Sequence, residues 1–142
     1  GKDGKGLYPV AVKYSEDLHS IGQFVQEGTP VLFETFLDIE NPDGELILEA
    51  DDVDDGFDYL NGADLREVNR AAFSATFQAH SERLPCVRLK ISELNEYSFG
   101  QLFYFFEFAC YLSGSMLGVN PFNQPGVENY KGYMFQALGK HK

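Results

Sequence analysis

The sequence predicts an α/β fold, with a mostly parallel sheet flanked by helices on both faces. Segments with helical spacing of apolar residues alternate along the chain with short segments rich in β-branched and aromatic residues. Such alternation is typical of parallel strands that are joined by helices. The chain has 142 residues, 44% hydrophobic and 15% aromatic, which suffices for one domain with a real core. Only two segments resemble core strands, so we expect an incomplete sheet.

The first helix is predicted over residues 15–27. Ser15 is placed to cap it, and the acidic residues that follow favour the positive end of the helix dipole. Its expected apolar stripe comprises Leu18, Ile21 and Val25. Residues 31–39 are predicted to form a buried strand, and residues 45–49 a short edge strand after a turn.

A long helix is expected next, over residues 63–83, after an acidic loop. Asp64 and Glu67 resemble a capping box at its start. Its expected buried face comprises Leu65, Val68, Ala72, Ala75 and Ala79. Residues 86–91 then form the second predicted core strand.

An aromatic-rich helix is predicted over residues 98–117, opened by a capping box of Ser98 and Gln101. We expect it to be the most buried element, with Phe103, Phe106 and Cys110 pointing inward. Phe105 and Phe108 are expected to cover a domain or subunit interface, because grouped exposed aromatics mark such surfaces.

Charge and cysteine content exclude several function classes. The chain carries 11 Lys and Arg against 22 Asp and Glu, a net charge of −11, which disfavours binding to nucleic acid or to an anionic membrane. Cys86 and Cys110 are too few for a disulfide scaffold and too far apart for a zinc cluster, so buried thiols in a reducing cytosol are expected. The run Gly1–Gly6 lacks phosphate-loop spacing and is expected to be flexible.

His19 is the first candidate functional residue. It falls in the first turn of the predicted helix, off the apolar stripe. A helix N-terminus disfavours a protonated imidazole, so a histidine there can serve as a base near neutral pH. The alternative is an ordinary surface histidine.

The last predicted helix, residues 125–138, carries the second candidate group. Gln124, Glu128 and Lys131 share one face at spacings of four and three, and a rigid segment with two prolines and a glycine leads into it. The alternative is a simple Glu–Lys surface pair. The opposite, buried stripe is expected to comprise Val127, Tyr130, Met134 and Leu138.

Two blocks of sequence resemble the glucose-6-phosphate isomerase family. The run from Gly118 to Lys131, with Phe-Asn-Gln, then Gly-Val-Glu, then Lys at fixed spacing, is similar to the C-terminal signature of that family. The run from Asp17 to Gln23 resembles the segment around its ring-opening histidine. The similarity continues from Gly1 to Gly139, is closest to the shorter bacterial enzymes, and covers about the last third of such an enzyme.

The resemblance implies a three-layer α/β sandwich of the sugar-isomerase (SIS) type. Residues 1–14 would be a linker from an upstream part, and residues 15–142 a portion of the C-terminal SIS domain. The implied activity is the cytoplasmic interconversion of glucose 6-phosphate and fructose 6-phosphate, in glycolysis and gluconeogenesis, through ring opening and a cis-enediol, without metal or other cofactor.

The resemblance also implies roles for individual residues. His19 matches the histidine that moves the ring-opening proton, contributed across the interface of a homodimer. Lys131 matches a lysine that contacts the sugar and assists that step, and Gln124 matches a substrate-binding glutamine. The family's essential carboxylate base and its first domain would lie before Gly1, so this chain alone is expected to be inactive. The alternative function is a non-catalytic SIS module that senses sugar phosphates.

Overall fold

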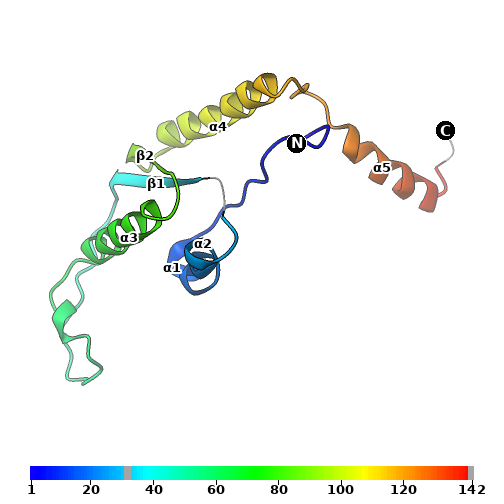
Figure 1. Ribbon diagram of the computed structural model, residues 1–142. Helices are drawn as coiled ribbons and strands as arrows, with labels where there is room; N and C mark the ends of the chain where they lie inside the picture. The colour runs from blue at the N-terminus through cyan, green and yellow to red at the C-terminus, as the bar shows by residue number, and fades with distance from the viewer. Residues whose placement is uncertain (31–32, 141–142) are drawn as a thin grey trace. The chain divides into compact units, whose positions relative to one another are not determined.

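The structure is a computed structural model that describes residues 1–30 and 33–140. It divides into two compact units, Gly1–Pro9 with Leu102–Lys142, and Val10–Gln101 (Figure 1). The elements in chain order are α1 (Tyr14–Asp17), the π-helical turn η1 (Leu18–Gly22), α2 (Gln23–Glu27), β1 (Glu34–Asn41), the 3-10 turn η2 (Asp58–Leu60), α3 (Leu65–Ser81), β2 (Cys86–Glu93), α4 (Glu96–Met116) and α5 (Pro125–Ala137).

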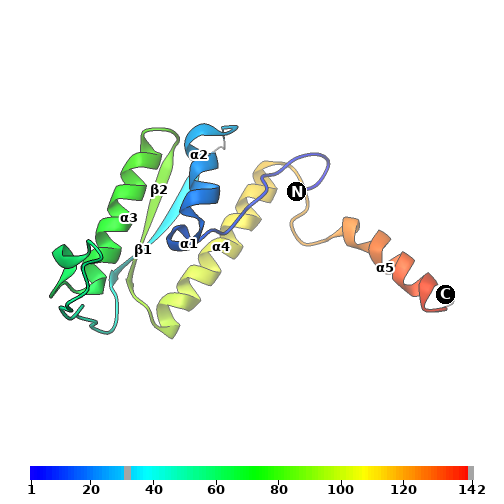
Figure 2. The same ribbon diagram turned by 90° about the horizontal axis from the view of Figure 1, so that it is seen from below.

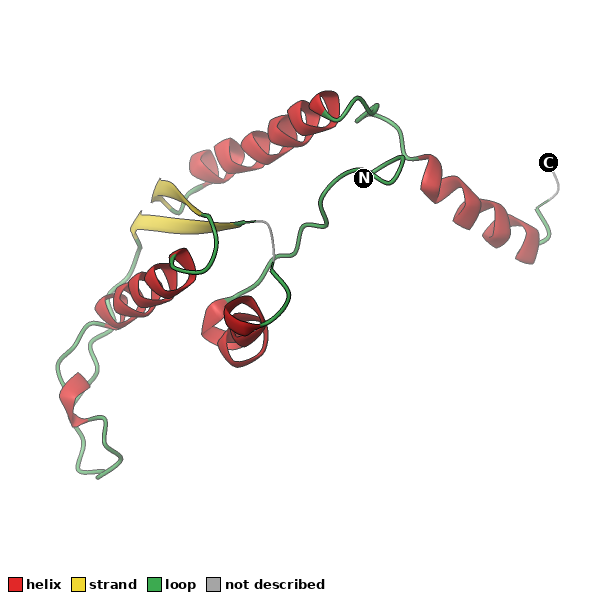
Figure 3. Ribbon diagram, in the orientation of Figure 1, coloured by secondary structure: helices red, strands yellow, loops and turns green. Residues whose placement is uncertain are grey.

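The α/β class is confirmed by the Val10–Gln101 unit. β1 and β2 pair in parallel, with Glu34 opposite Cys86, and α3 lies alongside them as the connecting helix (Figures 2 and 3). Parallel strands need such a crossover because the chain must return to the end of the sheet at which the first strand began. Both predicted core strands are present, each ending two residues later than expected. Val31 and Leu32, assigned by sequence to the first strand, lie outside the described residues.

The core of this unit is aromatic and covers one face of the sheet. Phe36 in β1 is buried and meets Phe77 of α3 edge-on at 5.2 Å between ring centroids, and Tyr14 of α1 in a stacked arrangement at 5.9 Å. On the opposite face, Leu37 and Val87 are 46% and 51% exposed. The sheet is therefore incomplete, as the sequence predicted.

The helical segment at residues 14–27 differs from its prediction. Helix begins at Tyr14, so Ser15 is not its cap, and the π-turn η1 interrupts it. A π-turn adds a residue to one turn and shifts the buried stripe. Gly22 and Val25 are consequently the buried residues, whereas Leu18 and Ile21 are exposed.

Two further predictions in this unit are wrong. Residues 45–49 do not form an edge strand: Ile47 makes one isolated antiparallel bridge with Asp64, in the long connection between β1 and α3 (Figure 3). The inner face of α3 is also rotated from the predicted one, because Phe73, Phe77 and His80 point to the sheet. The predicted inner residues Ala72, Ala75 and Ala79 are exposed.

α4 begins two residues before its predicted start. Asn95 caps it by accepting a 2.8 Å hydrogen bond from the Ser98 backbone, in place of the predicted box. The helix is not the most buried element: Phe103, Phe106 and Cys110 are exposed. Cys86 is half-buried and Cys110 is free at the surface, so the expectation of two buried thiols is wrong for Cys110.

The other unit holds α5 and the N-terminal residues. α5 begins at Pro125 as predicted and ends one residue early, but the stripe expected to be buried is exposed except at Met134. The glycine-rich start forms a short hairpin, in which Lys2 and Lys5 exchange backbone hydrogen bonds of 3.0 and 2.8 Å.

Candidate functional site

His19 lies in η1 with its side chain exposed to solvent. Because helix starts at Tyr14, His19 is in the second turn of the segment and not at its N-terminus. The prediction that His19 lies in the first turn, at the positive end of the helix dipole, is therefore wrong. Its accessibility agrees both with proton transfer to a ligand and with an ordinary surface histidine.

Gln124 immediately precedes α5 and Lys131 lies in the middle of that helix, and both are exposed. The Gln124 side chain makes no capping hydrogen bond, so its amide is not used at the helix end. Lys131 Nζ donates a 2.8 Å hydrogen bond to Glu128 Oε1, which is the surface pair predicted from spacing. An ammonium group has three donors, so this pair leaves others available for a ligand.

The loop that leads to Gln124 is fixed by several contacts. Gly118 has a φ of +70° at the end of α4, a conformation that favours glycine, and the Val119 backbone donates to the Gly114 carbonyl at 3.0 Å. A Cβ at Gly114 would lie 3.1 Å from Pro121 Cβ, so helix and loop are in close contact.

The N-terminal hairpin holds the same loop from another side. Lys2 Nζ donates to the Asn120 carbonyl and, at 2.5 Å, to Asn123 Oδ1, while Lys5 Nζ donates to the Leu117 carbonyl at 3.1 Å. These contacts anchor the residues immediately before Gln124.

The candidate residues fall in different units. Lys131 lies within α5, and Gln124 is the non-helical residue directly before that helix, so both belong to the same unit. His19 belongs to the Val10–Gln101 unit.

A partly buried polar cluster of Tyr14, Glu34 and His80, the Tyr14 cluster, was not predicted. The Tyr14 hydroxyl donates to Glu34 Oε1, and His80 Nδ1 lies 2.7 Å from Glu34 Oε2. The His80 side chain is 2% exposed. Burial, and next the hydrogen bond to Glu34, raise the pKa of Tyr14 well above its usual range, so the phenol keeps its proton. A signal for the cluster existed in the spacing of Phe73, Phe77 and His80, which places the histidine on an apolar helix face.

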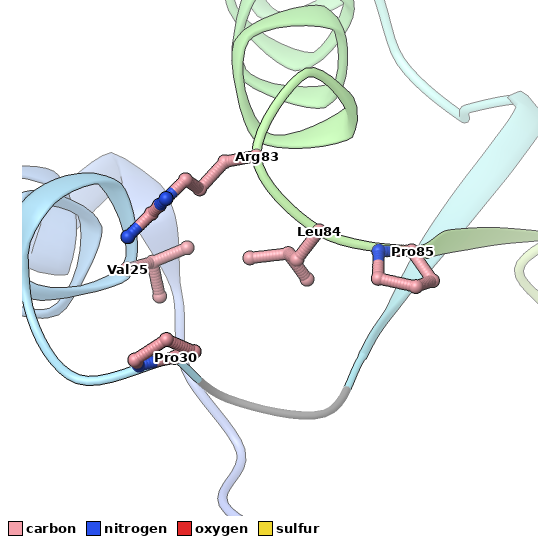
Figure 4. Close-up of a pocket in the computed structure, with 5 residues that line it drawn as sticks. All are labelled: Val25, Pro30, Arg83, Leu84 and Pro85. Atoms are coloured by element: carbon pink, nitrogen blue, oxygen red, sulfur yellow. The ribbon is translucent and has the colours of Figure 1, made fainter.

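A hollow of about 220 Å³ in the Val10–Gln101 unit is lined by Val25, Pro30, Arg83, Leu84 and Pro85 (Figure 4). It contains no predicted site residue. It lies beside Pro85, where β2 begins, whereas ligands of parallel sheets bind at the carboxyl ends of the strands. We do not assign the function to it.

Residues 1–30 and 33–140 offer neither a metal site nor a membrane span. No three His, Cys, Asp or Glu side chains in these ranges come together as metal ligands. None of the helices described there is long and apolar enough to cross a membrane.

Comparisons with known proteins bear on the identity of the chain. No family model matches it. It is 49% identical to the glucose-6-phosphate isomerase of Clostridium tetani, 52% to that of Staphylococcus haemolyticus and 53% to that of Bacillus cytotoxicus. Each match covers 99% of this chain and 32% of the relative, so the chain spans about a third of the length of these curated relatives.

Among solved structures, the chain resembles a hypothetical protein of Thermus thermophilus. The TM-score is 0.81 at 26% identity, over 87% of this chain and 30% of that protein. The α/β arrangement is thus found as part of a larger folded chain. By sequence, this chain corresponds over its whole length to about a third of a glucose-6-phosphate isomerase, which confirms the resemblance that its motifs predicted.

Proposed function

We propose that this chain forms part of a glucose-6-phosphate isomerase, which interconverts glucose 6-phosphate and fructose 6-phosphate. The observation that carries the proposal is the identity of about 50% to proteins of that name over 99% of the chain. Because the chain spans 32% of their length, we assign the activity to the longer polypeptide and not to this segment alone.

In this proposal the sugar ring opens before the isomerisation, and His19 moves the ring-opening proton. Imidazole suits this step because it can both take and give a proton near neutral pH. The exposed position of His19 supports the assignment, since a group that serves a ligand outside its own unit must be accessible. We propose that it serves the site of a second subunit in a homodimer.

Lys131 and Gln124 are proposed to hold the sugar. A dianionic substrate would be repelled by a chain of net charge −11, so local cations and polar donors must hold it. Lys131 supplies such a cation at the surface of α5, and the anchored loop fixes the position of Gln124.

The isomerisation itself needs a base that shuttles a proton between C1 and C2 of a cis-enediol. By the resemblance, this carboxylate comes from sequence that precedes Gly1. The proposed step is acid–base chemistry and requires neither metal nor nucleotide cofactor. A glycolytic role places the enzyme in the cytoplasm.

The test is turnover of fructose 6-phosphate by the full polypeptide that contains this chain, with His19→Ala and, as a matched control, Ser20→Ala. A general acid–base group contributes about 10²–10⁴-fold, so we expect His19→Ala to lower kcat in that range on the cyclic sugar. An open-chain sugar phosphate, which needs no ring opening, should be affected far less. Absence of isomerase activity in the unmodified full polypeptide would refute the proposal.

The alternative, a module that senses sugar phosphates, predicts binding without turnover. The names of the relatives do not favour it. The same assay separates the two functions, since a sensor would bind fructose 6-phosphate and leave it unchanged.

A further inference from the structure

We propose that the Tyr14 cluster is a positioning device for His19. It joins the helical segment that carries His19 to the sheet and to α3, and so fixes the direction in which the imidazole is presented. The proposal rests on the proposed function, in which His19 acts in ring opening.

The cluster connects three elements through one carboxylate. Tyr14 opens α1, Glu34 is the first residue of β1, and His80 lies in the last turn of α3. Both oxygens of Glu34 are engaged, Oε1 by the Tyr14 hydroxyl and Oε2 by His80 Nδ1 at 2.7 Å. Hydrogen bonds to a carboxylate shielded from water are strong and directional, so this junction resists rotation of the segment.

The ring of Tyr14 adds apolar contacts at the same point. It meets the His80 ring edge-on at 4.9 Å between centroids and stacks on Phe36 at 5.9 Å. A Cβ at Gly22 would lie 3.8 Å from Tyr14 Cδ1 and 3.1 Å from Leu18 Cδ1. Tyr14 therefore packs under η1, the turn that contains His19.

The segment needs such an anchor because little else holds it. A helix this short is marginal in water without tertiary contacts. Between Tyr14 and Glu27, only Gly22 and Val25 are buried. The π-turn sets the angle at which His19 leaves the segment, and π-turns are frequent at functional sites. The Tyr14 cluster fixes the start of the turn, and Gly22 fixes its end.

The first test measures the position of the segment without any assay of activity. In the full polypeptide, Tyr14→Phe keeps the aromatic packing and removes the hydroxyl that donates to Glu34. Losing one hydrogen bond to a charged acceptor should speed hydrogen–deuterium exchange of the amides at 18–23 by about tenfold or more. The matched control is Tyr59→Phe, which removes an exposed hydroxyl from the same unit and should change nothing there. Unchanged exchange in Tyr14→Phe would overturn the proposal.

The second test separates positioning from general destabilisation. On cyclic fructose 6-phosphate, Tyr14→Phe should lower kcat several-fold with little change in KM, while turnover of an open-chain substrate is retained. His80→Asn, whose amide nitrogen can take the place of Nδ1 as donor to Glu34, should restore much of the activity that His80→Leu loses. An equal loss on both substrates, or no rescue by His80→Asn, would overturn the positioning role.

The two proposals can fail separately. If the full polypeptide does not isomerise fructose 6-phosphate, the proposed function is wrong. The exchange experiment still decides whether the Tyr14 cluster fixes the segment that carries His19.

Discussion

The carboxylate of Asp38 in β1 accepts a 2.9 Å hydrogen bond from the guanidinium of Arg70 in α3, and only 4% of the Asp38 side chain is exposed. Arg88 of β2 donates to its other oxygen through Nε at 2.8 Å. Arg70 also donates to the Ile39 carbonyl at 3.2 Å. One buried carboxylate thus joins both strands to the helix between them.

Replacing this carboxylate should destabilise the fold. We expect Asp38→Asn to lower the free energy of unfolding by about 3 kcal/mol, the lower end for breaking a buried ion pair, because water can still reach the half-exposed arginines. Urea unfolding measures the effect. Asp52→Asn, in the exposed acidic loop, is the control and should stay within about 0.5 kcal/mol. Equal unfolding midpoints for the two variants would contradict the bridging role of Asp38.

Partial burial of the Tyr14 phenol predicts a dependence of stability on alkaline pH. Its pKa is raised by burial and by Glu34, so above the ordinary tyrosine value the folded state holds a proton that the unfolded state has lost. Stability is fully present below about pH 10, the unfolded pKa, and falls as the pH rises toward the folded pKa. Phenylalanine has no hydroxyl to titrate, so the Tyr14→Phe variant does not show this loss. The stability difference between wild type and Tyr14→Phe should therefore shrink between about pH 9 and about pH 11. Thermal unfolding across this range measures the difference, and a constant difference would argue against a raised pKa of Tyr14 in the folded state.

The sequence predicted the fold class and both core strands because alternating patterns of apolar residues are local signals. It misplaced the buried face of α3 because small alanines and large aromatics share the helix, and Phe36 of the sheet selects the aromatic side. Helical periodicity also cannot reveal a π-turn, so the sequence predicts an apolar stripe through Leu18 and Ile21 that the structure leaves exposed. These features depend on partners that are distant in the sequence.

The candidate site, too, could be predicted from the sequence only where the signal is local. Gln124 and Lys131 could be named from a rigid, motif-like segment, and the structure adds the contacts of Lys2 that hold its loop. The Tyr14 cluster could not be assembled from sequence because its three residues come from three elements. In α4, Phe105 and Phe108 are exposed as the sequence predicted. Phe103 and Phe106, which the sequence predicted to point inward, are exposed as well.

α4 presents a surface that we expect the rest of the longer polypeptide to cover. Phe103, Tyr104, Phe105 and Phe106 are consecutive, so they point to every side of the helix, and each is 45–66% exposed. A helix that is apolar all round is normally buried. Phe105→Glu should therefore lower the free energy of unfolding of the full polypeptide by about 2 kcal/mol or more, because burying an unpaired charge is costly. In this chain alone the same change should have little effect, and a similar effect in both would exclude a covering segment.

The contact between Gly114 and Pro121 predicts an effect on substrate binding. A methyl group at Gly114 would meet Pro121 Cβ at 3.1 Å and displace the loop that ends at Gln124. In the full polypeptide we expect Gly114→Ala to raise KM for fructose 6-phosphate several-fold. Gly132→Ala, in α5 with open space around it, is the control and should leave KM unchanged while stabilising the helix by up to about 1 kcal/mol. Equal KM values would show that the loop does not position Gln124.

The segment alone should not isomerise fructose 6-phosphate, although it carries His19, Gln124 and Lys131. In the proposed mechanism these residues open the ring and hold the sugar, but the carboxylate that takes the C2 proton is supplied by another part of the polypeptide. Losing a general base costs about 10²–10⁴-fold, and losing the remaining binding contacts removes much of the energy that orients the substrate.

Mixing the segment with the separately expressed remainder should restore turnover if the two pieces dock. In that complex, Lys131→Met should raise KM or lower kcat, because the sugar loses a cationic contact, whereas Lys90→Met, which removes a lysine paired with Glu40, should not. The measurement is the rate of glucose 6-phosphate formation from fructose 6-phosphate. Robust turnover by the segment without the remainder would contradict the assignment of the base to another part of the polypeptide. In the proposed mechanism His19, Gln124 and Lys131 open the ring and hold the sugar, and none of them takes the C2 proton.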